Sequence, residues 1–148
     1  MQNRKIIVGL VISIILSSSV VLGMSLDLKI KSILRKTVAN VSGFKGAAVV
    51  DASSGDLLGY YIPNERVALH KETMAATIAN IVRDVSKASK RLGLKPKWFG
   101  IGLSNGDKLI IGYITSDIFL GSLYSSYSPI GTIKYQMRKA INKLRNTL

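Results

Sequence analysis

The sequence has no cysteine and only one histidine, His70. Without cysteine the chain has no disulfide, no thiolate nucleophile and no cysteine–zinc site. No activated nucleophile lies near His70 in the sequence, and a lone helical histidine is more often a surface or capping residue than a catalytic base. We therefore expect no catalytic residue, and we expect that the protein is not an enzyme.

The usual signatures of nucleotide and metal sites are also missing. No glycine-rich loop ends in Gly-Lys-Ser or Gly-Lys-Thr, which argues against nucleotide hydrolysis by the chain itself. Gly100, Gly102 and Gly106 resemble a dinucleotide-binding loop, but a hairpin turn follows them and no helix begins there. The eight acidic residues are scattered, without a pair at metal-ligand spacing. We expect neither a cofactor nor a bound metal.

Acidic residues are scarce relative to basic ones. The 148 residues include 21 Lys and Arg against 8 Asp and Glu, which gives a formal net charge of +13. Such an excess favours a polyanionic neighbour, either nucleic acid, an anionic lipid surface or an acidic protein.

No charged residue occurs between Ile6 and Met24, and Arg4 and Lys5 precede this run. A helix of about 20 apolar residues crosses a bilayer, whereas the apolar part of a signal peptide usually has about 7–15. We therefore predict a membrane anchor over residues 1–24, with residues 6–24 in the bilayer. A cleaved signal peptide is the alternative. Lys and Arg near the two ends slightly favour a cytoplasmic C-terminal domain, and export after cleavage is the alternative location.

The remaining residues, 25–148, are long enough for one α+β domain. Apolar spacing predicts an amphipathic helix over residues 26–41, a long helix from after Asn64 to about Leu92, and a C-terminal helix over residues 133–148. Turn residues separate five predicted strands. The order is helix, two strands, helix, three strands, helix, which favours a five-stranded antiparallel sheet with helices on its faces. The predicted strands are residues 44–51, 57–62, 98–103, 108–115 and 118–124.

The long helix carries two apolar stripes. Bulky residues form one stripe, which we expect to face the sheet. Small residues form the other, which suits a second, closely packed helix; the alternative is that it reflects only the high helix propensity of alanine. The bulky stripe is Met74, Ile78, Ile81, Val85 and Leu92, and the small stripe is Ala75, Ala79, Val82, Ser86 and Ser89.

Three segments resemble the roadblock family, the relatives of dynein light chains that include partners of Ras-like GTPases. They are the opening hairpin at residues 41–56, the long central helix, and the C-terminal helix with its lead at residues 127–144. The resemblance implies a roadblock/profilin-like, non-catalytic scaffold that forms a homodimer or a heterodimer with a paralogue. It places the interface on residues 73–90 and 98–103, so that two sheets join edge to edge. The residues expected in that interface are Ala75, Ala79, Val82, Ser86, Trp98, Gly100 and Gly102.

The leading hypothesis is a membrane-tethered dimer that binds a small Ras-like GTPase. Basic residues after the anchor are expected to contact anionic lipid, at about 1 kcal/mol per residue, and a basic face that is only solvated is the equal alternative. A second hypothesis is an exported or surface-exposed sensory module whose sheet binds a small ligand. A third is nucleic-acid binding, which is disfavoured because the aromatic residues are not interleaved with basic ones. The expected lipid contacts are Lys29, Lys31, Arg35 and Lys36.

Overall fold

The computed structural model describes residues 24–148, so the predicted anchor at residues 1–24 lies outside the described residues apart from Met24. Within the described part, no helix is long and apolar enough to cross a bilayer. The elements are α2 (Leu26–Lys36), a 3-10 turn η1 (Val38–Asn40), β1 (Phe44–Asp51), β2 (Leu57–Tyr61), α3 (Glu65–Ala68), α4 (Lys71–Arg91), β3 (Trp98–Gly102), β4 (Lys108–Tyr113), β5 (Ile118–Tyr124) and α5 (Ile130–Thr147).

The strands form one five-stranded sheet in the order β2-β1-β5-β4-β3, and every neighbouring pair is antiparallel. The α+β class and the five-stranded antiparallel sheet are confirmed. The last strand, β5, inserts between β1 and β4, so the two hairpins are joined through it. This arrangement leaves β2 and β3 at the edges of the sheet.

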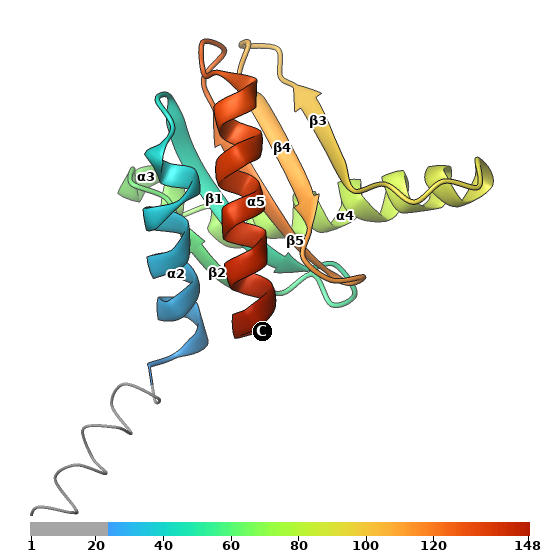
Figure 1. Cartoon of the computed structure of the whole chain (residues 1–148), viewed down its shortest axis with the longest axis horizontal. Helices are drawn as coiled ribbons and strands as arrows, with labels where there is room; N and C mark the ends of the chain where they lie inside the picture. Colours follow the sequence, from blue (N-terminus) through green and yellow to red (C-terminus); the bar gives the residue numbers. More distant parts are fainter. Residues whose placement is uncertain (1–23) are drawn as a thin grey trace, which may run out of the picture.

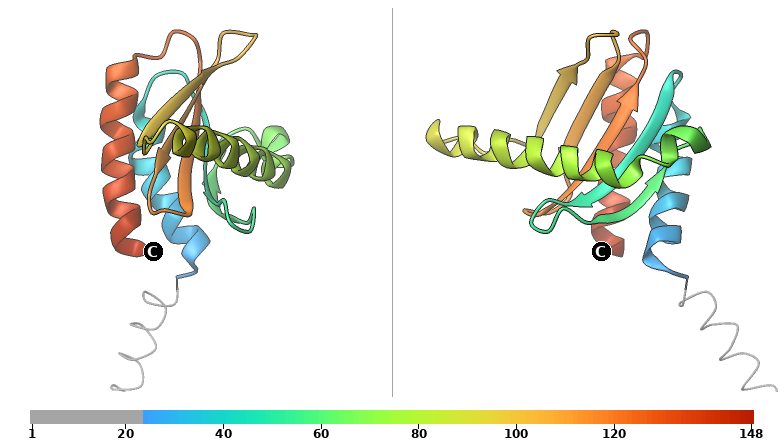
Figure 2. Two further views of the ribbon diagram at one scale, coloured as in Figure 1. Left: turned by 90° about the vertical axis from the view of Figure 1, so that its right-hand side faces the viewer. Right: turned by 180° about the vertical axis from the view of Figure 1, so that it is seen from behind.

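The sheet separates two hydrophobic cores. Helices α2 and α5 lie side by side on one face, and α4 crosses the other face (Figures 1 and 2). Side chains of β1 alternate between them, because successive residues of a strand point to opposite faces. Val49 is buried in the core under α2 and α5, and the next residue, Val50, in the core under α4.

Small residues on the sheet let the helices approach closely. A Cβ atom at Gly59 would lie 2.7 Å from the Ile30 Cβ on α2, and one at Gly121 would lie 3.0 Å from the Ile78 Cδ1 on α4. Ala47 and Ala48 are also buried on β1. Poor strand formers are tolerated here because larger side chains would push the helices off the sheet.

Two predicted helices are shorter than expected. The first ends at Lys36 rather than near residue 41, because Thr37 leaves the helical region (φ −122°, ψ −90°) and a 3-10 turn follows. The central helix is interrupted, since Asn64 caps the short α3 and α4 begins only at Lys71. The first and last predicted strands match the structure, and the other three end one or two residues early.

The predicted roles of the two stripes on the central helix hold only in part, since Ile78 of the bulky stripe belongs to the core under α4 and Ile81 packs against it. Ala75, Ala79 and Val82 of the small stripe are at most 1% exposed and lie against the molecule's own sheet. Of the bulky stripe, Ile78 is buried, but Leu92 is 73% exposed. The large rings of Tyr113 and Phe119 belong to the core under α4 and favour small helix residues there, whereas Gly121 makes room for Ile78.

Candidate interaction surface

One flank of α4 presents half-buried apolar side chains beside the sheet. Met74, Ile81 and Val85 are each partly exposed and follow one another at helical spacing. On the opposite flank, Arg83 Nε donates a hydrogen bond to the Ala52 carbonyl at 2.8 Å, which turns that flank toward the β1–β2 turn. The apolar flank therefore faces the other end of the strands.

The sheet beside this flank is also apolar and partly open. Phe99 and Ile101 of β3 and Leu109 of β4 lie on the α4 side of the sheet and are half-buried. Leu109 and Met74 line the same small hollow. We call this surface the α4–β3 shelf, defined by Met74, Ile81, Val85, Phe99, Ile101 and Leu109.

The shelf is bordered by an unpaired strand edge. Within residues 24–148, β3 pairs only with β4, so the backbone groups on its other side bond to no strand. Figures 1 and 2 show the C-terminal end of α4 extending beyond β3. Leu92 and Leu94 lie at this end and are 73% and 62% exposed. Exposed leucines beside an open edge are typical of a surface that is covered in the assembled protein.

The residues predicted for a dimer interface differ in whether a partner could reach them. Trp98, Gly100 and Gly102 lie on edge strand β3. Ser86 is half-buried, and its hydroxyl is hydrogen-bonded to the Tyr113 hydroxyl at 3.1 Å. The other three, Ala75, Ala79 and Val82, are covered by the chain's own sheet and present no surface to a partner.

Sequence reasoning missed the α4 side of the shelf. Ile81 and Val85 were identified as apolar, but their stripe was assigned to the core. Helical spacing shows that α4 has two apolar stripes. How deeply each stripe is buried depends on Tyr113 and Phe119, which follow α4 by more than 20 residues.

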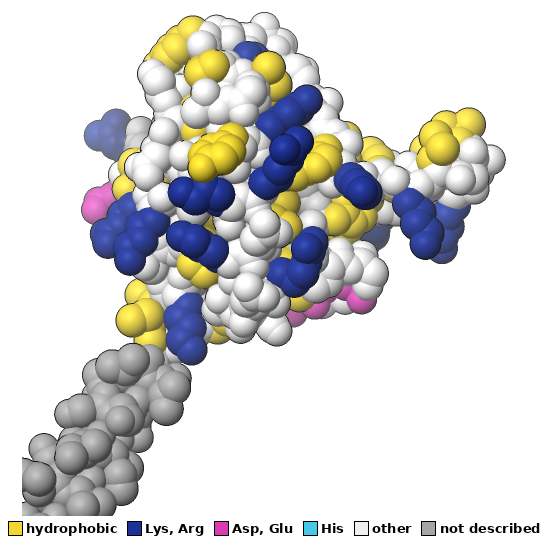
Figure 3. Space-filling view, in the orientation of Figure 1, with side chains coloured by type: hydrophobic (Ala, Val, Ile, Leu, Met, Phe, Trp, Pro, Cys, Tyr) yellow, Lys and Arg dark blue, Asp and Glu magenta, His cyan; other side chains and the backbone are white. Residues whose placement is uncertain are grey.

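The face formed by α2 and α5 is basic. Figure 3 shows Lys and Arg side chains over this face and few acidic ones. Lys31, Arg35 and Lys36 are exposed on α2, and Lys29 is half-buried. Helix α2 begins two residues after Met24, the last residue of the predicted anchor, so the predicted lipid contacts lie close to that anchor in sequence.

The ionisable groups with altered pKa values serve the fold. A hydrogen bond from Lys45 lowers the pKa of the Asp107 carboxyl, and burial raises the pKa of Tyr124 to about 12. No group of three or more His, Cys, Asp or Glu that could hold a metal occurs among residues 24–148.

Comparisons with known proteins bear on the fold. No protein-family model matches the sequence, and no curated protein matches it. Among solved structures, MglB from Myxococcus xanthus is similar with a TM-score of 0.69 and 18% identity, covering 80% of this chain and 86% of that one. A Roadblock/LC7 domain from Streptomyces avermitilis has a TM-score of 0.67 and 17% identity, covering 82% of this chain and 96% of that one. The gliding protein MglB from Thermus thermophilus has a TM-score of 0.69 and 16% identity, covering 82% of this chain and 89% of that one. At these identities the likeness establishes the fold alone, and residues 24–148 of this chain have the roadblock/LC7 fold.

Proposed function

We propose that the protein is a non-catalytic scaffold that pairs through the α4–β3 shelf and the β3 edge, is tethered to a membrane by residues 6–24, and binds a small Ras-like GTPase. The observation that carries the proposal is the open β3 edge beside a half-buried apolar helix flank, in a domain of the roadblock/LC7 fold. One of the similar solved structures is MglB in a tetrameric arrangement, at a TM-score of 0.69 and 16% identity.

Pairing of two β3 edges has a physical reason. An exposed strand edge is a template for another strand, and joining two edges about a two-fold axis satisfies both sets of backbone groups. It would also bring the α4–β3 shelf of each protomer against its partner and cover the exposed leucines at the end of α4. The partner is a second copy of this chain or a paralogue with the same edge.

The pairing is tested by cross-linking, which suits this chain because it has no native cysteine. In a two-fold antiparallel pair centred on β3, the middle residue Gly100 lies opposite its own copy, at a distance that a disulfide can bridge with small adjustment. We expect Gly100→Cys in the full chain to form a disulfide-linked dimer under mild oxidation. Gly131→Cys on α5, where an added Cβ meets nothing within 4 Å, is the control. Equal cross-linking of the two variants would contradict the β3 pairing.

The membrane and GTPase parts need separate experiments. Protease protection in sealed native membranes, read with the mass of the chain, tests whether residues 1–24 are retained and on which side the domain lies. A shielded cytoplasmic domain then justifies affinity capture with GDP and with a non-hydrolysable GTP analogue, in which a small GTPase should be retained in one nucleotide state. A domain that is digested from outside, or a shortened chain, excludes a cytosolic GTPase and favours the exported sensory module.

The basic residues of α2 support the tether. In a membrane-anchored chain, Lys31, Arg35 and Lys36 lie within 12 residues of Met24, the end of the proposed anchor, where anionic lipid attracts cations. A fluorophore on Lys36→Cys should report a less polar environment in anionic than in zwitterionic nanodiscs. The same label on Ser54→Cys, in the β1–β2 turn, serves as the control.

A further inference from the structure

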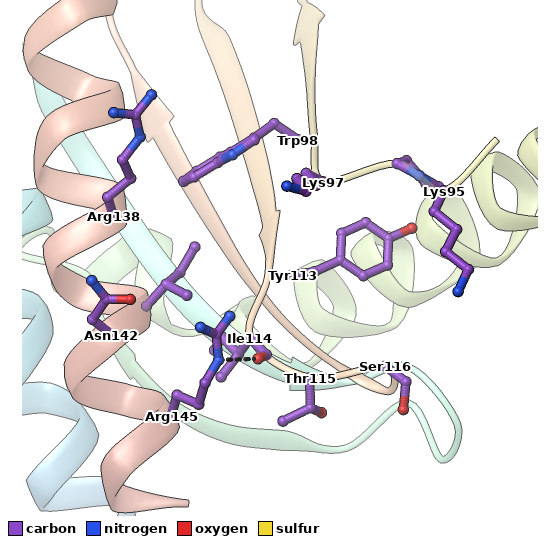
Figure 4. Close-up of a pocket in the computed structure, with 12 residues that line it drawn as sticks. Lys95, Lys97, Trp98, Tyr113, Ile114, Thr115, Ser116, Arg138, Asn142 and Arg145 are labelled. Atoms are coloured by element: carbon purple, nitrogen blue, oxygen red, sulfur yellow. Dashed lines mark hydrogen bonds between the residues drawn. The ribbon is translucent and has the colours of Figure 1, made fainter.

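A groove of about 580 Å³ lies on the α5 side of the sheet, away from the α4–β3 shelf. Figure 4 shows its walls: the C-terminal half of α5 on one side, and on the other the segment that joins α4 to β3 together with the β4–β5 turn. These walls come from three parts of the chain that are distant in sequence.

The groove is lined by four cationic side chains and no carboxylate. Arg138 and Arg145 come from α5, and Lys95 and Lys97 come from the α4–β3 segment. The single ion pair within residues 24–148 joins two other residues, so none of these four cations has a carboxylate partner there. The adjacent Asp117 lines the neighbouring groove beneath α4 instead. Four like charges around one hollow repel each other, and a bound anion would relieve that repulsion.

One arginine is already positioned for a ligand. Arg145 Nε donates a hydrogen bond to the Ile114 carbonyl at 3.0 Å, which fixes the guanidinium against the β4 end of the groove (Figure 4). This bond uses Nε and leaves both terminal nitrogens, with their N–H donors, for an anion. Asn142 and Thr115 add an amide and a hydroxyl to the lining.

The floor between the cations is apolar and aromatic. Trp98 and Ile141 both lie over Gly112 of β4, because a Cβ atom there would come within 2.8 Å of Trp98 Cζ3 and of Ile141 Cδ1. A glycine at this position therefore lets the indole ring of Trp98 pack directly on the sheet. The result is a flat apolar surface with cations at its rim, which suits a ligand that has an apolar part and a charged end.

We propose that this groove binds a phosphate monoester carried on an aromatic or other apolar group. Arg145 holds the phosphate, the other three cations add to the positive potential that attracts it, and Trp98 contacts the apolar part. A phosphate suits this arrangement better than a carboxylate, because it carries up to two negative charges and accepts hydrogen bonds in several directions. Such a group occurs in soluble phosphorylated metabolites and in the headgroup of phosphatidic acid. The proposal does not depend on dimerisation or on a GTPase partner.

Trp98 is the only tryptophan of the chain, so its fluorescence reports on the groove directly. The full chain in a non-ionic detergent is titrated with phenyl phosphate, and a saturable change of Trp98 emission is expected. Phenol and benzoate, which lack the phosphate, should bind at least about tenfold more weakly. Arg145→Gln should raise the Kd for phenyl phosphate about tenfold, the loss of one charge-assisted contact of about 1.4 kcal/mol, and Arg138→Gln should raise it by a smaller factor, because it removes attraction but no direct contact. Arg66→Gln on α3, an exposed arginine outside the groove, should leave it unchanged.

The Arg138 side chain is exposed and, unlike that of Arg145, donates no hydrogen bond within residues 24–148, so its variant separates binding from folding if Arg145→Gln is unstable. Mixed micelles distinguish the two sources of the ligand. If phosphatidic acid, but not phosphatidylcholine, suppresses the response to phenyl phosphate, the groove accepts a lipid headgroup; if neither does, it selects a soluble phosphate. Either result supports the site. The proposal is overturned if Trp98 emission shows no saturable change, or if both groove variants bind phenyl phosphate as tightly as Arg66→Gln.

Discussion

Lys45 Nζ donates a hydrogen bond to the Asp107 carboxylate at 2.6 Å, although 62 residues separate the two in sequence. Lys45 lies on β1 and Asp107 just before β4, so the pair reaches across β5, which lies between those strands. Asn105 donates a second hydrogen bond to the same carboxylate oxygen at 3.0 Å. The contact joins the β3–β4 hairpin, which carries half of the α4–β3 shelf, to the centre of the sheet.

This pair predicts an acid-sensitive contribution to stability. The hydrogen bond from Lys45 holds the pKa of the Asp107 carboxyl below its ordinary value of 3.8. A carboxyl whose pKa is lowered in the folded state stabilises that state above the unfolded pKa, and the contribution is lost as the pH falls through the folded pKa. We expect the urea midpoint to decrease below about pH 4, and Asp107→Asn to reduce this decrease. Some acid dependence remains in the variant, because hydrogen bonds from Ser53 also lower the pKa of Asp51. An unchanged slope in Asp107→Asn would refute the assignment.

Tyr124 predicts the opposite dependence at alkaline pH. Its side chain is fully buried, its hydroxyl donates a hydrogen bond to the Val38 carbonyl at 3.1 Å, and burial raises its pKa from 10.0 to about 12. The folded state therefore holds this proton more tightly than the unfolded state, and stability is lost as the pH rises from 10 toward 12. Tyr124→Phe should weaken that loss while lowering the free energy of unfolding at pH 7 by about 1–3 kcal/mol, since it leaves the Val38 carbonyl unpaired. Tyr127→Phe, at a side chain that is 71% exposed, should do neither.

Gly59 is expected to be intolerant of any side chain. A Cβ there would meet Ile30 Cβ and Cγ2 at 2.7 Å, and these atoms adjoin the α2 backbone and cannot swing away. Gly59→Ala should lower the free energy of unfolding by about 1–3 kcal/mol in denaturant titrations. The matched change Gly131→Ala, in open space on α5, should be neutral or slightly stabilising because alanine favours helix. Equal effects of the two variants would mean that α2 does not pack on β2 as described.

Val85 tests whether the α4–β3 shelf is the dimer surface. Val85→Arg places a charge on the apolar flank of α4, where association would bury it, and should shift the full chain from dimer to monomer in sedimentation velocity experiments. Ala76→Arg makes the same kind of change at an exposed position on the other flank of the helix and should leave the dimer intact. Thermal unfolding of both variants distinguishes lost association from lost folding. A dimer that survives Val85→Arg would place the interface elsewhere.

Local patterns in the sequence determined the elements of this protein and their order. The strand at residues 118–124 and the Asn105-Gly106 turn could be predicted because strand alternation and turn chemistry act between residues close in the chain. Gly106 has φ of +88°, which the turn requires and which glycine adopts without strain. The apolar spacing of the C-terminal helix likewise predicted its buried side, since Ile133, Met137 and Leu144 are all fully buried.

Tertiary structure alone decided how these elements face one another. Two stripes on the central helix were visible in the sequence, but Ala75 is fully buried and Ile81 only half-buried against the core, because of the aromatic rings that α4 meets on β4 and β5. The basic groove likewise exists only because β5 inserts between the two hairpins and α5 packs beside Trp98. Neither surface has a local signature, since the volume and charge around each side chain come from residues far away in the sequence.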